Sequence, residues 1–170
     1  MLHCPLRAAK NAKYPPMDVI YQSDIDVALG TDFGMMDPFD CMRFALMIAR
    51  MNGFSTPIIT AYNALEMMTR KAARILGLGE EIGSIEPGKK ADLILIDLNQ
   101  PHLQPFYSDE DLISILVYNA SGNDVDTVFI DGEKVMEKKH ILTVNEAQIM
   151  RKASKTNKEI CRRIVKLNVK

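Results

Sequence analysis

One carboxylate at the end of a predicted buried strand is the side chain of this sequence best placed to do chemistry. The apolar run 27–30 is typical of a strand covered on both faces, and Thr31 and Asp32 follow it directly. Chemistry in parallel α/β enzymes collects at the carboxyl ends of the strands, where Asp32 would lie. A carboxylate there can bind a divalent metal, or take a proton from water and return it to a leaving amine. On spacing alone, a strand-end aspartate that caps a helix or anchors a loop is the commoner arrangement.

Residues that could complete a metal site around Asp32 are few. Catalytic zinc sites use three protein ligands, often imidazoles, and the only histidines of the sequence are His3, His102 and His140. His3 and Cys4 are adjacent near a predicted strand end, where neighbouring side chains point to opposite faces and do not readily bind one ion. A loop histidine hydrogen-bonded to the backbone is the alternative for His3. The sequence has no glycine-rich phosphate loop, Gly-x-Ser-x-Gly elbow or Cys-x-x-Cys pair.

The composition indicates an ordinary globular chain. With 170 residues, 47% hydrophobic and 25% charged, it can form one domain or slightly more with a real core. No apolar run is long enough for a membrane span, and no secretory signal is evident. The three scattered cysteines read as thiols in a reducing compartment, so we expect a cytoplasmic location and no membrane partner. Residues 150–170 hold eight basic side chains and one acidic, which favours the solvated face of a helix over a nucleic-acid site.

The first half of the chain alternates between strand and helix patterns, which indicates a parallel sheet. Asp37 is an acidic cap with Pro38 just inside the helix. The predicted order is a strand ending before Pro5, a short helix over 17–22, the strand at 27–30, a helix from Asp37 to Gly53, and a long helix from 55–57 to about Leu76.

After Gly83 the pattern changes to a small β-rich unit that ends in a helix. Proline and glycine in Glu86-Pro87-Gly88 suit a type II turn, and Asp131-Gly132 suits a two-residue hairpin turn. Residues 112–117 are compatible with helix or strand. The predicted strands are 91–97, 125–130 and 134–137, and an amphipathic helix with Ile149, Ala153, Thr156, Ile160, Ile164 and Leu167 on one face follows them.

Three segments, read together, carry a resemblance to a known family. They are His3-Cys4-Pro5, the run Val27-Ala28-Leu29-Gly30-Thr31-Asp32, and the stretch from Ala72 through Ile82-Gly83-Ser84-Ile85-Glu86-Pro87-Gly88 to Leu93. Together they resemble the C-terminal part of the amidohydrolase superfamily, in the branch of methylthioadenosine/S-adenosylhomocysteine deaminases, guanine deaminases and chlorohydrolases. The first two segments are similar to the seventh and eighth barrel strands, and the third to the passage from barrel to β-sandwich. Further likeness at 101–105, 120–125 and 128–135 extends the resemblance over nearly the whole chain.

The resemblance implies an α/β fragment of a TIM-barrel amidohydrolase. Residues 1–80 would hold the last strand-helix units of the barrel, 81–142 part of the companion β-sandwich, and 143–170 the amphipathic terminal helix. The implied activity is hydrolytic deamination of a purine-type small molecule with zinc or iron as the divalent metal. Asp32 matches a metal ligand and proton carrier, and His3 matches a residue near the substrate.

The departures from the family concern the metal site. The family's His-x-His on the first strand and its histidines on the fifth and sixth strands have no counterpart, and family members are more than twice as long as this chain. We therefore expect the chain by itself to bind no metal and to be inactive. Two alternatives remain: a separate polypeptide or self-association completes the open sheet, or the basic C-terminal helix makes the chain a nucleic-acid-binding module, a partner we do not favour.

Overall fold

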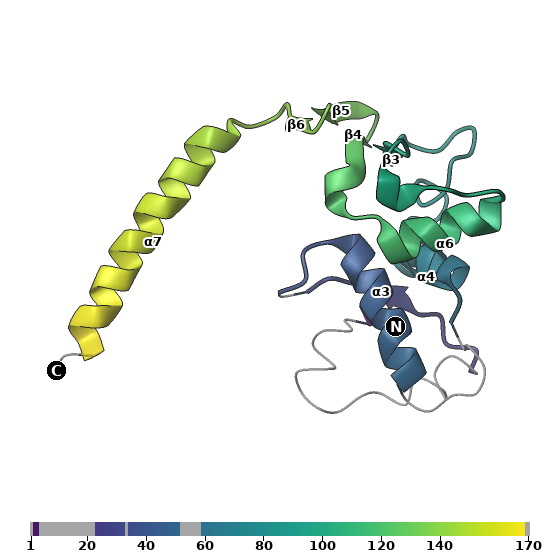
Figure 1. Ribbon diagram of the computed structural model, residues 1–170, viewed down its shortest axis with the longest axis horizontal. Helices are drawn as coiled ribbons and strands as arrows, with labels where there is room; N and C mark the ends of the chain where they lie inside the picture. Colours follow the sequence, from purple (N-terminus) through teal and green to yellow (C-terminus); the bar gives the residue numbers. More distant parts are fainter. Residues whose placement is uncertain (1, 4–22, 33, 52–58, 169–170) are drawn as a thin grey trace.

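The computed structural model describes residues 2–3, 23–32, 34–51 and 59–168 of the chain. Cys4, the helix predicted over 17–22 and the helix end predicted at Gly53 lie outside the described residues. Within them, two sheets and several helices form a mixed α/β body, and the last helix extends away from it (Figure 1). The mixed α/β class expected from the sequence is confirmed.

The parallel pair predicted from the first half of the chain is present. Strand β1 (Leu2–His3) pairs in parallel with β2 (Ala28–Leu29), with His3 opposite Leu29. Both residues of β2 are buried, as expected for a strand covered on both faces. Helix α3 (Pro38–Met51) begins as predicted, because the Asp37 carboxylate accepts a hydrogen bond of 2.9 Å from the Phe39 N–H.

The second long helix differs from the prediction in its start and its continuity. It consists of α4 (Ala61–Met68) and α5 (Arg70–Ile75), separated at Thr69. Thr60 caps α4: its side chain accepts from the Asn63 N–H at 3.2 Å, and the Asn63 side chain accepts from the Thr60 N–H at 3.0 Å. This reciprocal capping starts the helix well after 55–57. At this break, the Thr69 hydroxyl donates a hydrogen bond of 2.7 Å to the Leu65 carbonyl.

The three predicted strands of the β-rich unit are present, and a short fourth strand at His140–Ile141 was not predicted. A four-stranded antiparallel sheet contains β3 (Leu93–Ile96), β4 (Val125–Ile130), β5 (Glu133–Glu137) and β6 (His140–Ile141) in chain order. Asp131 and Gly132 both have positive φ, 52° and 83°, as a two-residue hairpin turn requires. Between β3 and β4 lie η1 (Pro101–Leu103), α6 (Asp109–Asn119) and η2 (Gly122–Asp124), so the ambiguous run 112–117 is helical.

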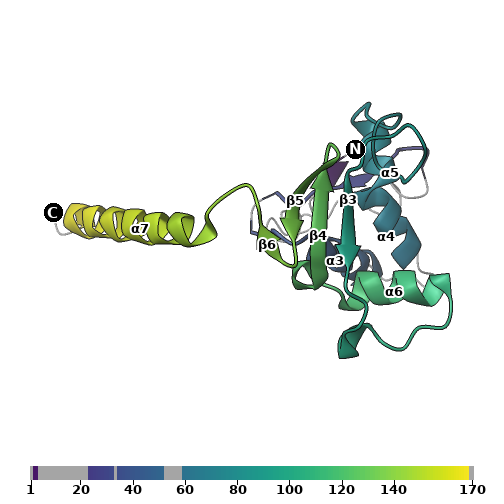
Figure 2. The same ribbon diagram turned by 90° about the horizontal axis from the view of Figure 1, so that it is seen from above.

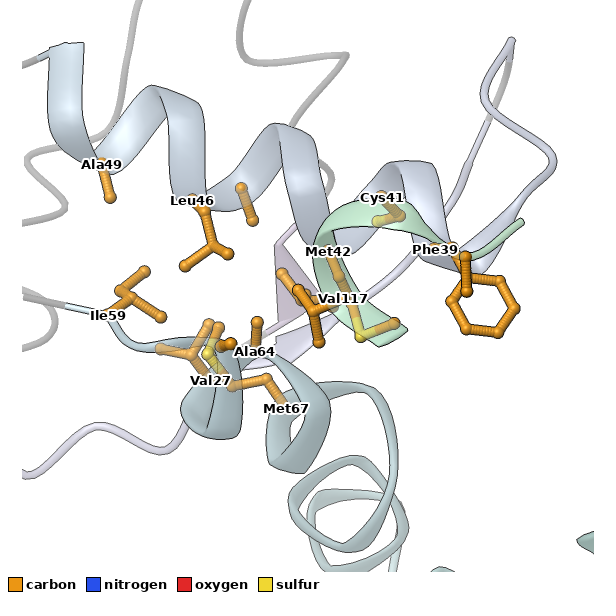
Figure 3. Packing of buried hydrophobic residues seen from close by; sticks show 14 of the residues in the cluster. Val27, Phe39, Cys41, Met42, Leu46, Ala49, Ile59, Ala64, Met67 and Val117 are labelled. Atoms are coloured by element: carbon orange, nitrogen blue, oxygen red, sulfur yellow. The ribbon is translucent and has the colours of Figure 1, made fainter. Parts of the chain in front are cut away.

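The core forms where α3, α4 and α6 meet above β2 (Figure 3). Leu46 and Cys41 from α3, Val117 from α6 and Ala64 from α4 are at most 1% exposed. Met67 is also buried and fills part of this core. The sheet β3–β6 contributes through Val125, so one apolar cluster joins the two halves of the chain.

Helix α7 (Glu146–Asn168) extends away from this body in both views (Figures 1 and 2). Its described side chains, residues 146–165, are all exposed. The amphipathic helix predicted from the sequence is therefore present, but its apolar face packs on nothing in the described structure. Among the described residues, no helix combines the length and the apolar character needed to cross a bilayer.

Candidate functional site

Asp32 lies three residues beyond β2, at the carboxyl end of the parallel pair. Its side chain is exposed, and its backbone has φ of 49°, in the left-handed region that aspartate tolerates better than most residues. The ion pair between Arg74 and Asp26, at 2.7 Å, holds the start of the same strand against α5. The prediction that Asp32 follows a buried strand at its carboxyl end is thus met in the geometry, whereas its catalytic role stays a prediction.

His3 ends the strand that pairs with β2. Because His3 is opposite Leu29 in a parallel pair, His3 and Asp32 belong to the same edge of this sheet. The structure describes the backbone of His3 only, so its assignment as a substrate-binding residue stays a prediction.

The loop that carries Asp32 is fixed at both ends. On the strand side, the buried Cys41 thiol donates to the Gly30 carbonyl at 3.5 Å, a weak bond that ties the loop to α3. On the helix side, Asp37 accepts a second hydrogen bond, 2.8 Å long, from the Gly122 N–H of η2. The position of Asp32 therefore depends on α3 and on a turn about 90 residues away in the sequence.

That distant turn is held by a buried carboxylate. Asp124, 5% exposed, accepts hydrogen bonds from the Ser121 N–H at 2.8 Å and the Ser121 hydroxyl at 3.1 Å, and its other oxygen lies 3.1 Å from His102 Nε2. Burial on its own would raise the pKa of Asp124. The hydrogen bonds from Ser121 and His102 outweigh burial and lower that pKa below its ordinary value. The turn is therefore built around an ionised group.

Arg43 connects α3 to the end of α6. Its guanidinium donates to the carbonyls of Tyr118 at 3.0 Å and Ala120 at 2.8 Å, which lie where the helix leaves its last carbonyls without intrahelical partners. Arg50, two turns along α3, lies over the Tyr118 ring and donates to its hydroxyl. Two arginines of one helix thus clamp the end of another.

A shallow, open hollow of about 500 Å³ borders the residues that follow Asp32. Its apolar side chains come from the loop and from the outer face of α3, and Met36 and Met47 are 83% and 55% exposed. Asp37 and Arg43 take part in the lining, but both are engaged by the contacts described above. The lining consists of Gly34, Met35, Met36, Asp37, Asp40, Arg43, Phe44 and Met47.

The described residues do not make a complete metal site. Asp32 can supply one carboxylate oxygen, a ligand that zinc accepts, but catalytic zinc sites use three protein ligands. In the part of the chain that the structure describes, no three His, Cys, Asp or Glu side chains come together in a way that could hold a metal ion. His102 is instead bound to Asp124, and His140 is exposed in β6.

Sequence reasoning missed the network around Asp124 because its members are far apart in the chain. The spacing Ser121-x-x-Asp124 is the pattern of a capping box, so the sequence itself carries a signal for the contact between Ser121 and Asp124. The contact of His102 with Asp124 had none, since 22 residues separate them within the β-rich unit. The contact of Asp37 with Gly122 had none, since it depends on how η2 meets the start of α3.

Comparison with known proteins identifies the family of this chain. A sequence model of the amidohydrolase family matches residues 7–135. The 5-methylthioadenosine/S-adenosylhomocysteine deaminase of Syntrophomonas wolfei is 38% identical over 149 residues, which are 85% of this chain and 34% of the relative. The 5′-deoxyadenosine deaminase of Methanobrevibacter smithii is 39% identical over 149 residues, with the same two shares.

Solved structures agree. A zinc-bound adenosine deaminase from Xanthomonas campestris matches with a TM-score of 0.84 at 28% identity, over 95% of this chain and 37% of that one. Guanine deaminase of E. coli matches with a TM-score of 0.71 over 81% of this chain and 33% of its own, and at 23% identity this likeness concerns the fold alone.

The chain has a mixed α/β architecture, and the relatives that it matches are named as deaminases. The chain belongs to the amidohydrolase family, which confirms the resemblance carried by its three sequence segments. It spans about a third of the length of the curated relatives it matches.

Proposed function

We propose that this chain is the C-terminal third of a metal-dependent hydrolytic deaminase that acts on a carbon–nitrogen bond of a purine-type substrate in the cytoplasm. In this proposal residues 1–80 are the last strand-helix units of a TIM barrel, 81–142 part of a β-sandwich, and 143–170 a terminal helix. The observation that carries the proposal is the family match over residues 7–135 together with relatives named as nucleoside deaminases.

In this proposal Asp32 is the catalytic residue of the chain. A carboxylate at the carboxyl end of a parallel strand can accept a proton and pass it to a leaving amine. The same carboxylate would be the one ligand that this chain gives to a zinc or iron ion, the other ligands coming from the remaining two thirds of the fold. His3, at the same sheet edge, would contact the substrate. The contacts of Cys41 and Asp37 support the role of Asp32, because they fix the loop that carries it.

The missing strands can be supplied in two ways. They can precede this chain in one longer polypeptide, or a separate polypeptide can pair with the edge of β2 that no strand of the described residues occupies. The DNA immediately upstream of the Met1 codon distinguishes the two, since an in-frame region encoding His-x-His would place the missing strands in the same polypeptide. We expect the chain by itself to hold no stoichiometric metal and to release no ammonia.

A chimera tests the proposal directly. The last third of the Syntrophomonas wolfei relative is replaced by this chain, and ammonia release from 5-methylthioadenosine, S-adenosylhomocysteine and 5′-deoxyadenosine is measured alongside metal content. We expect the chimera to bind metal and to turn over at least one substrate. Asp32→Asn should lower kcat about 10²–10⁴-fold, the usual contribution of a positioned acid or base.

Asp24→Asn is the matched control, because Asp24 is an exposed aspartate that precedes the same strand. It should leave kcat unchanged. The proposal fails if Asp32→Asn is as active as Asp24→Asn in the chimera, or if the isolated chain binds stoichiometric metal and deaminates these substrates.

A further inference from the structure

The half-buried carboxylate of Asp37 makes two hydrogen bonds to two different segments. Its Oδ1 accepts from the Phe39 N–H at 2.9 Å and so caps α3, while its Oδ2 accepts from the Gly122 N–H at 2.8 Å. A helix cap needs one side-chain oxygen, which serine or asparagine supplies equally well. The second oxygen therefore serves a contact that capping does not require. We call the hydrogen bond between Asp37 Oδ2 and the Gly122 N–H the tether.

The turn at the far end of the tether is firmly held. Its Asp124 carboxylate is 5% exposed and accepts two hydrogen bonds from Ser121 within the turn. The Asp124 carbonyl accepts from the Asp97 N–H at 3.0 Å, which attaches the turn to the end of β3. On the other side, Arg43 of α3 donates to the carbonyl of Ala120, which is fully buried. The turn therefore gives the tether a fixed anchor in the β-rich unit.

The near end of the tether adjoins both segments that flank Asp32. Asp37 follows Asp32 by five positions in the sequence. The Asp37 carbonyl accepts from the Cys41 N–H at 3.1 Å, and the Cys41 thiol donates to the carbonyl of Gly30, two positions before Asp32. The chain on each side of Asp32 is thus attached to the start of α3. A shift of Asp37 would move both attachments together.

We propose that the tether is a positioning contact for the deaminase reaction, in which Asp37, through Oδ2, keeps the Asp32 carboxylate within reach of the proton that it transfers. The inference rests on the proposed function of Asp32. Proton transfer requires the donor and acceptor atoms at hydrogen-bond distance, and a displacement of about 1 Å can lower the rate about 10²-fold. The β-rich unit thereby determines where the catalytic carboxylate lies, although it supplies no group to the reaction itself.

Gly122→Pro removes the donor of the tether with little other change. Proline has no N–H, and it is favoured at the first position of a helix, which Gly122 occupies in η2. Ser121 already has φ of −138° and ψ of 169°, the extended conformation that a residue before proline adopts. Gly122→Ala is the matched control, because alanine keeps the N–H and its Cβ would lie 3.5 Å from Asp37 Oδ2, an ordinary contact distance.

Asp37→Ser removes the tether from its other end. Serine keeps an oxygen that can cap α3 but has no second oxygen for Gly122. Because Gly122→Pro and Asp37→Ser alter different segments and share only the loss of the tether, an effect common to both identifies the tether as its cause.

Hydrogen–deuterium exchange of the full chain by itself tests the tether without any need for activity. Both variants should speed exchange of the amides in residues 34–41 about tenfold or more, since a hydrogen bond to a charged group no longer opposes local opening. Gly122→Ala should match the wild type, and residues 125–137 should exchange equally in all four proteins. Wild-type exchange of 34–41 in both tether variants would overturn the proposal.

Steady-state kinetics in the chimera with the Syntrophomonas wolfei relative test the positioning role. Gly122→Pro and Asp37→Ser should each lower kcat about tenfold or more and change KM less than about threefold, because the contact acts on the reacting carboxylate and not on substrate binding. The double variant should be no slower than the slower single variant, since both remove one contact. Gly122→Ala should keep the kcat of the unsubstituted chimera.

An active chimera whose kcat is insensitive to both tether substitutions, or losses that multiply in the double variant, would overturn the positioning role alone. A chimera that releases no ammonia before any substitution would instead count against the proposed function.

Discussion

Replacing Asp124 with alanine is expected to lower the free energy of unfolding by about 3 kcal/mol at neutral pH. The carboxylate is 5% exposed and has hydrogen-bond partners in the Ser121 N–H, the Ser121 hydroxyl and His102. A hydrogen bond to a charged group contributes about 1.5–3 kcal/mol, and bonds that share one acceptor group do not add fully. The loss should also loosen the Gly122 N–H contact with Asp37, since Gly122 belongs to the same turn.

The effect of Asp124→Ala should depend on pH in a defined direction. Hydrogen bonding lowers the pKa of Asp124 in the folded state below its ordinary value of 3.8, despite burial. A group whose pKa is lowered on folding stabilises the protein above its unfolded pKa, and that contribution is lost as the pH falls through the folded pKa. The difference between wild type and Asp124→Ala should therefore be full at pH 7 and shrink below about pH 4.

Urea unfolding followed by far-UV circular dichroism at pH 7 and pH 3 measures both quantities. For a chain of this size, 3 kcal/mol corresponds to a fall in Tm of about 6–12 °C. Asp126→Ala is the matched control, because Asp126 is half-buried nearby and accepts one hydrogen bond, 2.8 Å long, from the Thr127 hydroxyl. We expect it to cost about 1 kcal/mol. Equal losses for the two variants, or an Asp124→Ala loss that is the same at pH 3 and pH 7, would refute this reasoning.

Two further substitutions test the packing. Gly83 and Gly88 both have φ of 94°, but an added Cβ at Gly83 would lie 2.6 Å from the Ala73 Cβ, whereas one at Gly88 meets nothing within 4 Å. Gly88→Ala should lower the free energy of unfolding by about 1 kcal/mol, because alanine is strained at this positive φ. Gly83→Ala should lower it by about 1–3 kcal/mol more, because its Cβ would also collide with Ala73. Equal unfolding midpoints for the two variants would contradict the close approach of Gly83 to Ala73. Leu46 is a core residue, 1% exposed, and Leu46→Ala should lower the free energy of unfolding by about 3 kcal/mol. Met47 lies on the same helix but is 55% exposed, so Met47→Ala should lower it by less than about 1 kcal/mol. Urea unfolding midpoints measure both changes.

Local signals predicted the parts of the fold that depend on neighbouring residues. The cap at Asp37, the turn at Gly88 and the hairpin at Asp131-Gly132 are each set by the conformations that one or two residue types allow. The start of α4 was missed, although Thr60 and Asn63 carry a capping pattern, because the helical periodicity continued on both sides of it. The run 112–117 was ambiguous because its nearly continuous apolar pattern has little period of its own.

The sequence predicted the candidate site only where the order of residues along the chain determines their positions in the fold. A buried strand followed by Thr31 and Asp32 is enough to place the carboxylate at a sheet edge, and the parallel partner that carries His3 agrees with that placement. What holds the Asp32 loop could not be predicted, because the contacts of Asp37 and Asp124 join segments that only tertiary packing brings together. Likewise, the periodicity of α7 shows that one face is apolar but does not say what packs against that face.

The buried thiol of Cys41 gives the chain an internal reporter of local opening. Cys41 is fully buried beneath the loop that leads to Asp32, whereas Cys161 is exposed on α7. A thiol reagent should label Cys161 without any opening of the fold, but it can reach Cys41 only when α3 separates from that loop. The labelling rate of Cys41, followed by peptide mapping, thus measures how often the Asp32 loop comes loose without any substitution in the protein.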